Sequence, residues 1–91
     1  MTVYIAAVNM SGGTQHEHIA KVVWVMDGTY RGGISTTSEI VDFINKGNSV
    51  MVGDGSTKVQ VGVVKREGRS SYIRTFADNK WTDNLLAVPR F

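Results

Sequence analysis

Hydrophobic patterning near the start of the chain predicts two consecutive strands. Residues 3–10 (VYIAAVNM) and 19–26 (IAKVVWVM) are rich in β-branched and aromatic side chains and contain no proline, which is typical of strands. The segment between them, residues 11–18 (SGGTQHEH), holds two glycines that tolerate positive φ angles and is longer than a tight hairpin turn. We therefore expect an antiparallel pair of strands joined by a loose loop.

The middle of the chain has the pattern of a single helix. In residues 35–48 (STTSEIVDFINKGN), Thr36 and Glu39 have the spacing of a capping box, and apolar side chains then recur at helical spacing. Gly47 is expected to end the helix, because glycine readily adopts the left-handed conformation of a helix terminus. A helix this short would not persist alone in water, so its apolar face must pack on a sheet.

Three further strands are predicted after the helix. Residues 49–52 form a short one, 58–65 (KVQVGVVK) place Val at every second position, and 71–77 (SYIRTFA) alternate between two faces. A turn signal at Asp54-Gly55 separates the first two of these strands.

The order strand-strand-helix-strand-strand-strand predicts one α+β domain spanning residues 1–91. We expect a mainly antiparallel sheet of about five strands with one helix packed on it. The two glycines at 32–33 predict a loose segment before the helix, and Asp78-Asn79 predicts another turn.

The C-terminus is apolar to its last residue, with Leu85, Leu86, Val88 and Phe91. Such a segment either folds back as a closing strand or is buried in a second subunit. Because small domains have small cores and often gain more by association, we expect a homo-oligomer.

Composition excludes several classes of protein. The chain has no cysteine, which removes disulfides, thiolate zinc sites and cysteine nucleophiles. No stretch approaches the roughly 18 consecutive apolar residues of a membrane span, and the start lacks the features of a signal peptide, so we expect a cytoplasmic protein with no membrane partner. The net charge is +2, and four basic residues fall within 65–74. This basic stretch is too short to predict general nucleic-acid binding.

His16 and His18 raise the question of a metal site. In an extended segment, residues two apart point the same way, and their imidazoles could converge on one ion. Glu17 would then face the opposite side, and no other acidic residue has a characteristic ligand spacing. The alternative is that one imidazole caps a loop carbonyl while the other is solvated. We found no nucleophile elbow and no phosphate loop, so an enzyme is not the favoured interpretation and no cofactor is expected.

Residues 72–84 (YIRTFADNKWTDN) crowd polar recognition groups beside aromatic surfaces. The planar guanidinium of Arg74 suits phosphate or carboxylate, and Trp81 offers a stacking face. Alternatively, Arg74 pairs with Asp83 and Trp81 is a core side chain. The candidate ligand-binding residues are His16, His18, Arg74, Thr75, Trp81, Asp83 and Asn84.

The chain resembles a family of small bacterial and phage proteins known as domain of unknown function 3892. The likeness lies in YIAAVNMSGGTQHEHIAKVVW, STTSEIVDFINKGN, VGVV and YIRTFADNKWTDNLLAVPRF, which occur in that order and cover nearly the whole chain. One departure is Asn79-Lys80, where the family pattern has a glycine after Asp78. The resemblance implies no activity; it implies a bacterial cytoplasm and a phage or prophage gene.

The leading hypothesis is a non-enzymatic protein of phage or bacterial origin that binds a small anionic, nucleotide-like ligand and could thereby sequester it. One alternative is a protein-protein module or phage-encoded inhibitor of a host protein, engaged through the apolar C-terminus and the basic turn at 65–69. Another is a metal-dependent hydrolase built on His16 and His18.

Overall fold

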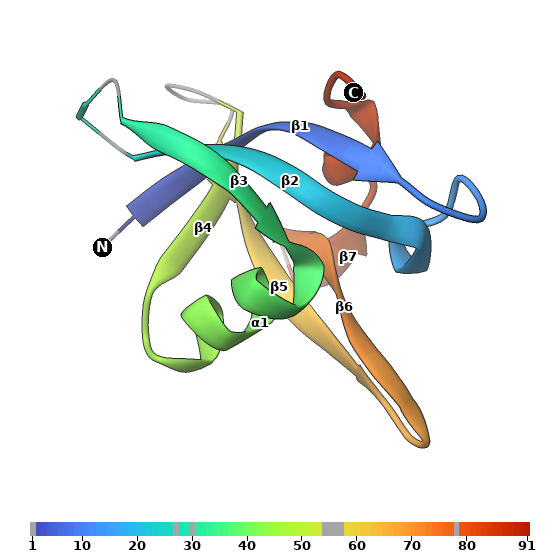
Figure 1. The fold of residues 1–91 in the computed structure, drawn as a ribbon. Helices are drawn as coiled ribbons and strands as arrows, with labels where there is room; N and C mark the ends of the chain where they lie inside the picture. Colours follow the sequence, from blue (N-terminus) through green and yellow to red (C-terminus); the bar gives the residue numbers. More distant parts are fainter. Residues whose placement is uncertain (1, 27, 30, 54–57, 78) are drawn as a thin grey trace.

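The protein forms a curved sheet of seven strands with one α-helix (Figure 1). The computed structural model describes residues 2–26, 28–29, 31–53, 58–77 and 79–91. The α+β class and the mainly antiparallel sheet are thereby confirmed. The elements are β1 (Thr2–Met10), η1 (His16–His18), β2 (Ile19–Met26), β3 (Gly32–Thr36), α1 (Thr37–Asn45), β4 (Ser49–Val52), β5 (Val59–Arg66), β6 (Arg69–Ala77), β7 (Lys80–Thr82) and η3 (Asn84–Ala87), where η denotes a 3-10 helix.

The sheet consists of two antiparallel meanders that meet at one parallel pair of strands. The strand order is β3-β2-β1-β4-β5-β6-β7, so β1 to β3 form a first meander and β4 to β7 a second. Residues 2–4 of β1 lie parallel to residues 49–51 of β4. All other strand pairs are antiparallel. The two halves of the molecule are therefore joined through a short stretch of backbone pairing.

The strand β3 was not predicted, because its two glycines were interpreted as a loose segment. In the structure β3 pairs with β2, and a Cβ at Gly32 would clash with the carbonyl oxygen of Trp24. A Cβ at Gly33 would lie 3.2 Å from the Trp24 ring. The indole Nε1 of Trp24 also donates to Ser35 Oγ at 2.9 Å. The glycines thus allow close packing of an edge strand onto Trp24.

The strand β7 is the second strand of the sheet in addition to the five that were expected. It pairs with β6 through Phe76 opposite Trp81 and Ala77 opposite Lys80. Asn79 in the turn has a φ of 62°, a left-handed conformation that asparagine tolerates better than most residues. Asparagine can therefore make this turn in place of the glycine of the family pattern. Asp78 lies outside the described residues, as does the Asp54-Gly55 turn.

The helix α1 begins and ends as predicted. Thr36 Oγ1 accepts from the Glu39 backbone N–H at 3.2 Å, and Glu39 Oε1 accepts from the Thr36 N–H at 2.9 Å. The pKa of Glu39 is lowered, first by the hydrogen bond from the Thr36 backbone N–H and then by one from the Thr36 hydroxyl to the same carboxylate. Gly47 follows the helix with a φ of 94°. The helix contacts strands of both meanders, and Ile40 is its buried residue.

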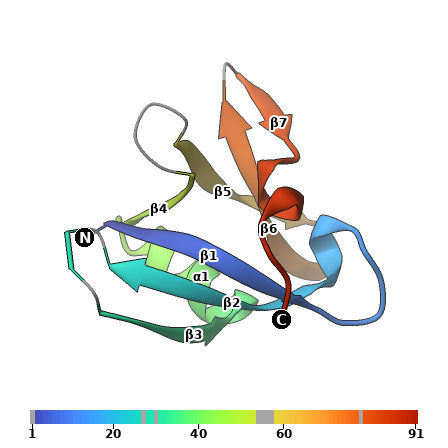
Figure 2. The same cartoon turned by 90° about the horizontal axis from the view of Figure 1, so that it is seen from above.

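The C-terminal segment folds back onto the sheet, but as a 3-10 helix and one isolated bridge to β1 where a closing strand was one of the two arrangements expected. After β7, Leu85 of η3 is fully buried. The Val8 N–H donates to the Pro89 carbonyl at 2.9 Å, and the Phe91 N–H donates to the Val8 carbonyl at 3.1 Å. Figure 2 shows this segment running back beside the end of β1. The C-terminal segment bonds to the part of the β1 edge that does not pair with β4. The second meander is therefore attached to the first at two places.

The buried core lies where the helix, the two meanders and the C-terminal return meet. In the part of the chain that the structure describes, no helix is long and apolar enough to cross a membrane. The buried apolar side chains are Val3, Ile5, Val8, Ile19, Val22, Ile40, Val50, Val52, Val61, Ile73 and Leu85.

Candidate functional site

The 3-10 helix η1 places its two histidines in different surroundings. The His18 ring packs against Gly13, and its Nδ1 accepts from the Gln15 backbone N–H at 3.1 Å. His16, in contrast, is buried. A 3-10 helix has three residues per turn, so side chains two apart point about 120° away from each other. The extended geometry assumed for a shared metal ion is therefore absent.

The wider surroundings of the histidines also lack a metal-binding group. Among residues 2–26, 28–29, 31–53, 58–77 and 79–91, no three His, Cys, Asp or Glu side chains are grouped closely enough to hold a metal ion. The non-metal alternative also needs correction: His18 accepts from a backbone N–H of its own loop and does not cap a carbonyl, and His16 is buried and not solvated.

His16 meets the C-terminal half of the chain at Arg74 and Asp83. Arg74 Nη2 donates to Asp83 Oδ1 at 2.7 Å, and the same oxygen lies 3.9 Å from His16 Nε2. Arg74 Nε donates to the Thr82 carbonyl at 3.1 Å, which fixes the guanidinium against β7. The pairing of Arg74 with Asp83, expected as a structural alternative, is present. It also brings three of the candidate residues into one cluster.

The imidazole of His16 is an unsatisfied polar group. Within the described part of the chain, its buried Nε2 has no hydrogen-bond partner. The pKa of His16 is lowered, first by burial and then by the nearby Arg74 charge, while Asp83 acts in the opposite direction. The ring is therefore neutral at neutral pH. A buried polar atom without a partner costs stability, which makes this atom a candidate for contact with a ligand.

A polar cleft of about 130 Å³ opens beside His16 and Arg74. Its other lining residues are Gln15, Glu17 and Tyr72. Because Tyr72 and Arg74 are two apart on β6, they point to the same side of that strand. The cleft is thus formed by η1 on one side and β6 on the other.

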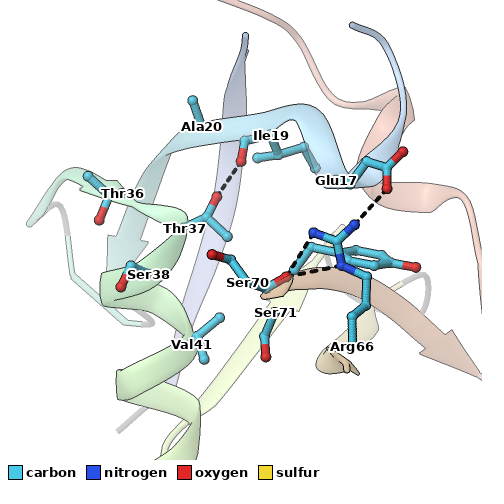
Figure 3. A pocket seen from close by; sticks show the side chains of 11 residues that line it. Glu17, Ile19, Ala20, Thr36, Thr37, Ser38, Val41, Arg66, Ser70 and Ser71 are labelled. Carbon is cyan, nitrogen blue, oxygen red and sulfur yellow. Dashed lines mark hydrogen bonds and ion pairs between the residues drawn. The ribbon is translucent and has the colours of Figure 1, made fainter. Parts of the chain in front are cut away.

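A larger groove of about 500 Å³ adjoins this cleft, and both are lined by Glu17 and Tyr72. Figure 3 shows the groove between the start of α1, the start of β2 and the hairpin of β5 and β6. Hydroxyl side chains are frequent in its wall. The lining residues are Glu17, Ile19, Ala20, Thr36, Thr37, Ser38, Val41, Arg66, Ser70, Ser71 and Tyr72.

Arg66 is held rigidly at the edge of the groove (Figure 3). Its Nη1 donates to Glu17 Oε2 at 2.8 Å, while Nε and Nη2 donate to the Ser70 carbonyl at 3.0 and 2.8 Å. The guanidinium lies over the Tyr72 ring, 4.9 Å from its centroid. From the sequence, Arg66 was identified as part of a basic turn, but the groove was not predicted. The one sequence feature that indicates the groove is the number of serines and threonines near Thr36 and Tyr72.

The other candidate residues lie outside the cluster. Thr75 is buried, and its hydroxyl donates to the Thr82 carbonyl at 3.0 Å, so it ties β6 to β7. Trp81 packs over Gly62 and meets the Phe76 ring edge-on, with centroids 5.1 Å apart. Asn84 is an exposed residue at the start of η3.

The fold and the site define a small α+β protein with a polar, arginine-lined cleft. A family model described as "Protein of unknown function (DUF3892)" matches residues 4–89. Since the match covers nearly the whole chain, the protein belongs to this family, and the resemblance stated from the sequence is confirmed. No curated protein and no solved structure matches the chain.

Proposed function

We propose that the protein binds a small anionic, nucleotide-like ligand without catalysing a reaction, and that the anionic group lies between His16 and Arg74. The observation that carries this proposal is the buried, unpartnered Nε2 of His16 beside a guanidinium at a polar cleft. A neutral imidazole can donate one N–H, and arginine donates several, so the pair suits an oxyanion.

Asp83 supports the proposal because its carboxylate already occupies the position of an anion. Its Oδ1 is bonded to Arg74 but lies 3.9 Å from His16 Nε2, which is too far for a hydrogen bond. The Asp83 side chain is 73% exposed. An exposed ion pair contributes only about 0 to 1 kcal/mol, so a phosphate with several oxygens could replace this carboxylate and reach both donors.

The first test is titration of the protein with inorganic phosphate and with nucleoside monophosphates by calorimetry. We expect Arg74→Gln to weaken binding about tenfold or more, as for loss of a charge-assisted hydrogen bond. We expect Asp83→Asn to strengthen it by up to about fivefold, because the competing carboxylate is removed. Asp42→Asn, on the exposed side of α1, is the matched control and should leave the affinity unchanged.

Two results would contradict the proposal. One is the absence of binding by either probe to the folded wild-type protein. The other is an affinity that is the same in Arg74→Gln, Asp83→Asn and the wild type, since binding would then lie elsewhere.

The cellular setting is also part of the proposal: a homo-oligomeric protein of bacterial or phage origin that sequesters its ligand in the cytoplasm. The lack of cysteine fits a reducing compartment. Exposed apolar side chains such as Ile34, which is 61% exposed on the edge strand β3, favour self-association. Sedimentation equilibrium measures the subunit number directly, and a monomer at micromolar concentration would exclude the oligomer.

A second candidate function is an inhibitor that binds a host protein through Phe76 and Trp81. These two side chains are 39% and 43% exposed and lie in contact on the same face of the second meander. The apolar C-terminal residues fit this role less well, because Leu85 is buried within the fold. If the aromatic pair is the contact surface, a partner captured by the wild type should be lost with Phe76→Ser.

A further inference from the structure

Glu17 occupies the junction of the two cavities. It lines both the cleft of His16 and Arg74 and the larger groove. Arg66 bonds to its Oε2, and the carboxylate side chain is still 40% exposed. A carboxylate has two oxygens and about four acceptor sites, so Glu17 retains the capacity to accept further hydrogen bonds. Glu17 is thus an acceptor in the wall of the same cleft as His16 and Arg74.

The wall of the groove beyond Glu17 is suited to a ligand that carries hydroxyl groups. Ser38, Ser70 and Ser71 supply hydroxyls that can both donate and accept. The Thr37 hydroxyl is already directed to the Ile19 carbonyl, which leaves it able to accept. Such a wall does not favour a purely apolar body, whereas a sugar ring could satisfy these groups.

Two residues of β6 connect the cleft of His16 and Arg74 with the larger groove. Tyr72, which lies under the Arg66 guanidinium, is two residues from Arg74, and Cα atoms at this spacing in a strand are about 6.5 to 7 Å apart. A group bound at Arg74 and a ring placed in the groove beside Tyr72 would therefore be neighbours. A single small molecule can span the two cavities.

From these contacts we infer that the ligand is a phosphorylated sugar, with its phosphate between His16 and Arg74 and its vicinal hydroxyls donating to Glu17. This inference rests on the proposed function and adds the class of molecule to it. Arg66 and Tyr72 position the Glu17 carboxylate. The groove accommodates the sugar and whatever is attached to it.

The experiment compares inorganic phosphate, ribose 5-phosphate and 2-deoxyribose 5-phosphate by calorimetry with wild type and Glu17→Gln. Ribose 5-phosphate should bind about a hundredfold tighter than phosphate, since two hydroxyls donate to Glu17 and each hydrogen bond to a charged group adds roughly tenfold. The deoxy sugar should fall between them. Glu17→Gln should remove most of the advantage of the sugar while leaving phosphate binding equal or stronger. Glu67→Gln, at the tip of the hairpin and outside both cavities, is the matched control.

The outcomes separate this inference from the proposed function. If phosphate binds in an Arg74-dependent manner but ribose 5-phosphate binds no tighter, the sugar assignment is wrong and the anion site stands. The same conclusion follows if the sugar advantage survives in Glu17→Gln, with circular dichroism confirming that the variant is folded. If no probe binds, both are wrong.

Discussion

At the scale of single residues, His16 makes the stability of the protein depend on pH. Burial lowers its pKa in the folded state, whereas the unfolded chain has the ordinary value of about 6.5. The unfolded state therefore takes up a proton more readily, and the free energy of unfolding decreases as the pH falls through about 6.5 towards the folded value.

Replacement of His16 isolates this contribution. We expect His16→Gln to show a smaller fall in Tm than the wild type between neutral and mildly acidic pH, because the titrating group is removed. Gln60→Thr, which changes an exposed residue of β5 that has no titratable group, should keep the slope of the wild type. Equal slopes in wild type and His16→Gln would contradict the assignment.

A bound anion would act on the protonation of His16 in the opposite direction to burial. A negative group beside His16 favours the protonated ring and so opposes the effects of burial and of Arg74. Binding of an anion whose own charge stays constant in this range, such as sulfate, should therefore tighten as the pH is lowered into the mildly acidic range. Calorimetry at several pH values would detect the accompanying proton uptake.

At the scale of elements, α1 depends on its N-terminal cap. Thr36 Oγ1 satisfies a backbone N–H that the helix itself cannot satisfy. We expect Thr36→Ala to lower the free energy of unfolding by about 1 kcal/mol, whereas Thr36→Ser keeps the acceptor and should retain most of the stability. Urea unfolding of the two variants tests this, and an alanine variant as stable as the serine variant would contradict it.

The helix was predictable because its signals are local, but the strands were predictable only in part. Thr36, Glu39 and Gly47 act on backbone groups within a few residues of themselves. The role of Gly32 and Gly33, in contrast, depends on Trp24 in the neighbouring strand. The same two glycines that suggest a loop in the sequence make close packing possible in the sheet.

The candidate site, too, could be predicted from the sequence only in part. Arg74 and Asp83 lie opposite each other across a predicted turn, so their pairing could be considered from the sequence. His16 was included in the same candidate set, but its approach to Arg74 could not be derived from the sequence, because it depends on how β1, η1 and the second meander are arranged in space. The groove was not anticipated either, since its walls come from η1, α1 and the hairpin of β5 and β6.

At the scale of the whole molecule, the C-terminal return holds the second meander against β1. Leu85 is fully buried in this return. We expect Leu85→Ala to lower the free energy of unfolding by about 2 to 5 kcal/mol, from lost burial and an incompletely collapsed cavity. Leu86→Ala is a suitable comparison, because Leu86 is only partly buried and should cost less. A Leu85 variant no less stable than the Leu86 variant would show that the return contributes little.

The short parallel pair of β1 and β4 also has a consequence for the order of folding. Each meander pairs strands that are neighbours in the chain, whereas residues 2–4 must find residues 49–51. Contacts between distant segments form slowly because the intervening loop must first be closed, so we expect this join to be completed late. Until then β1 and β4 each present an unpaired edge, and a second chain could supply the missing strand. The same join is thus a natural position for strand exchange between copies of the protein.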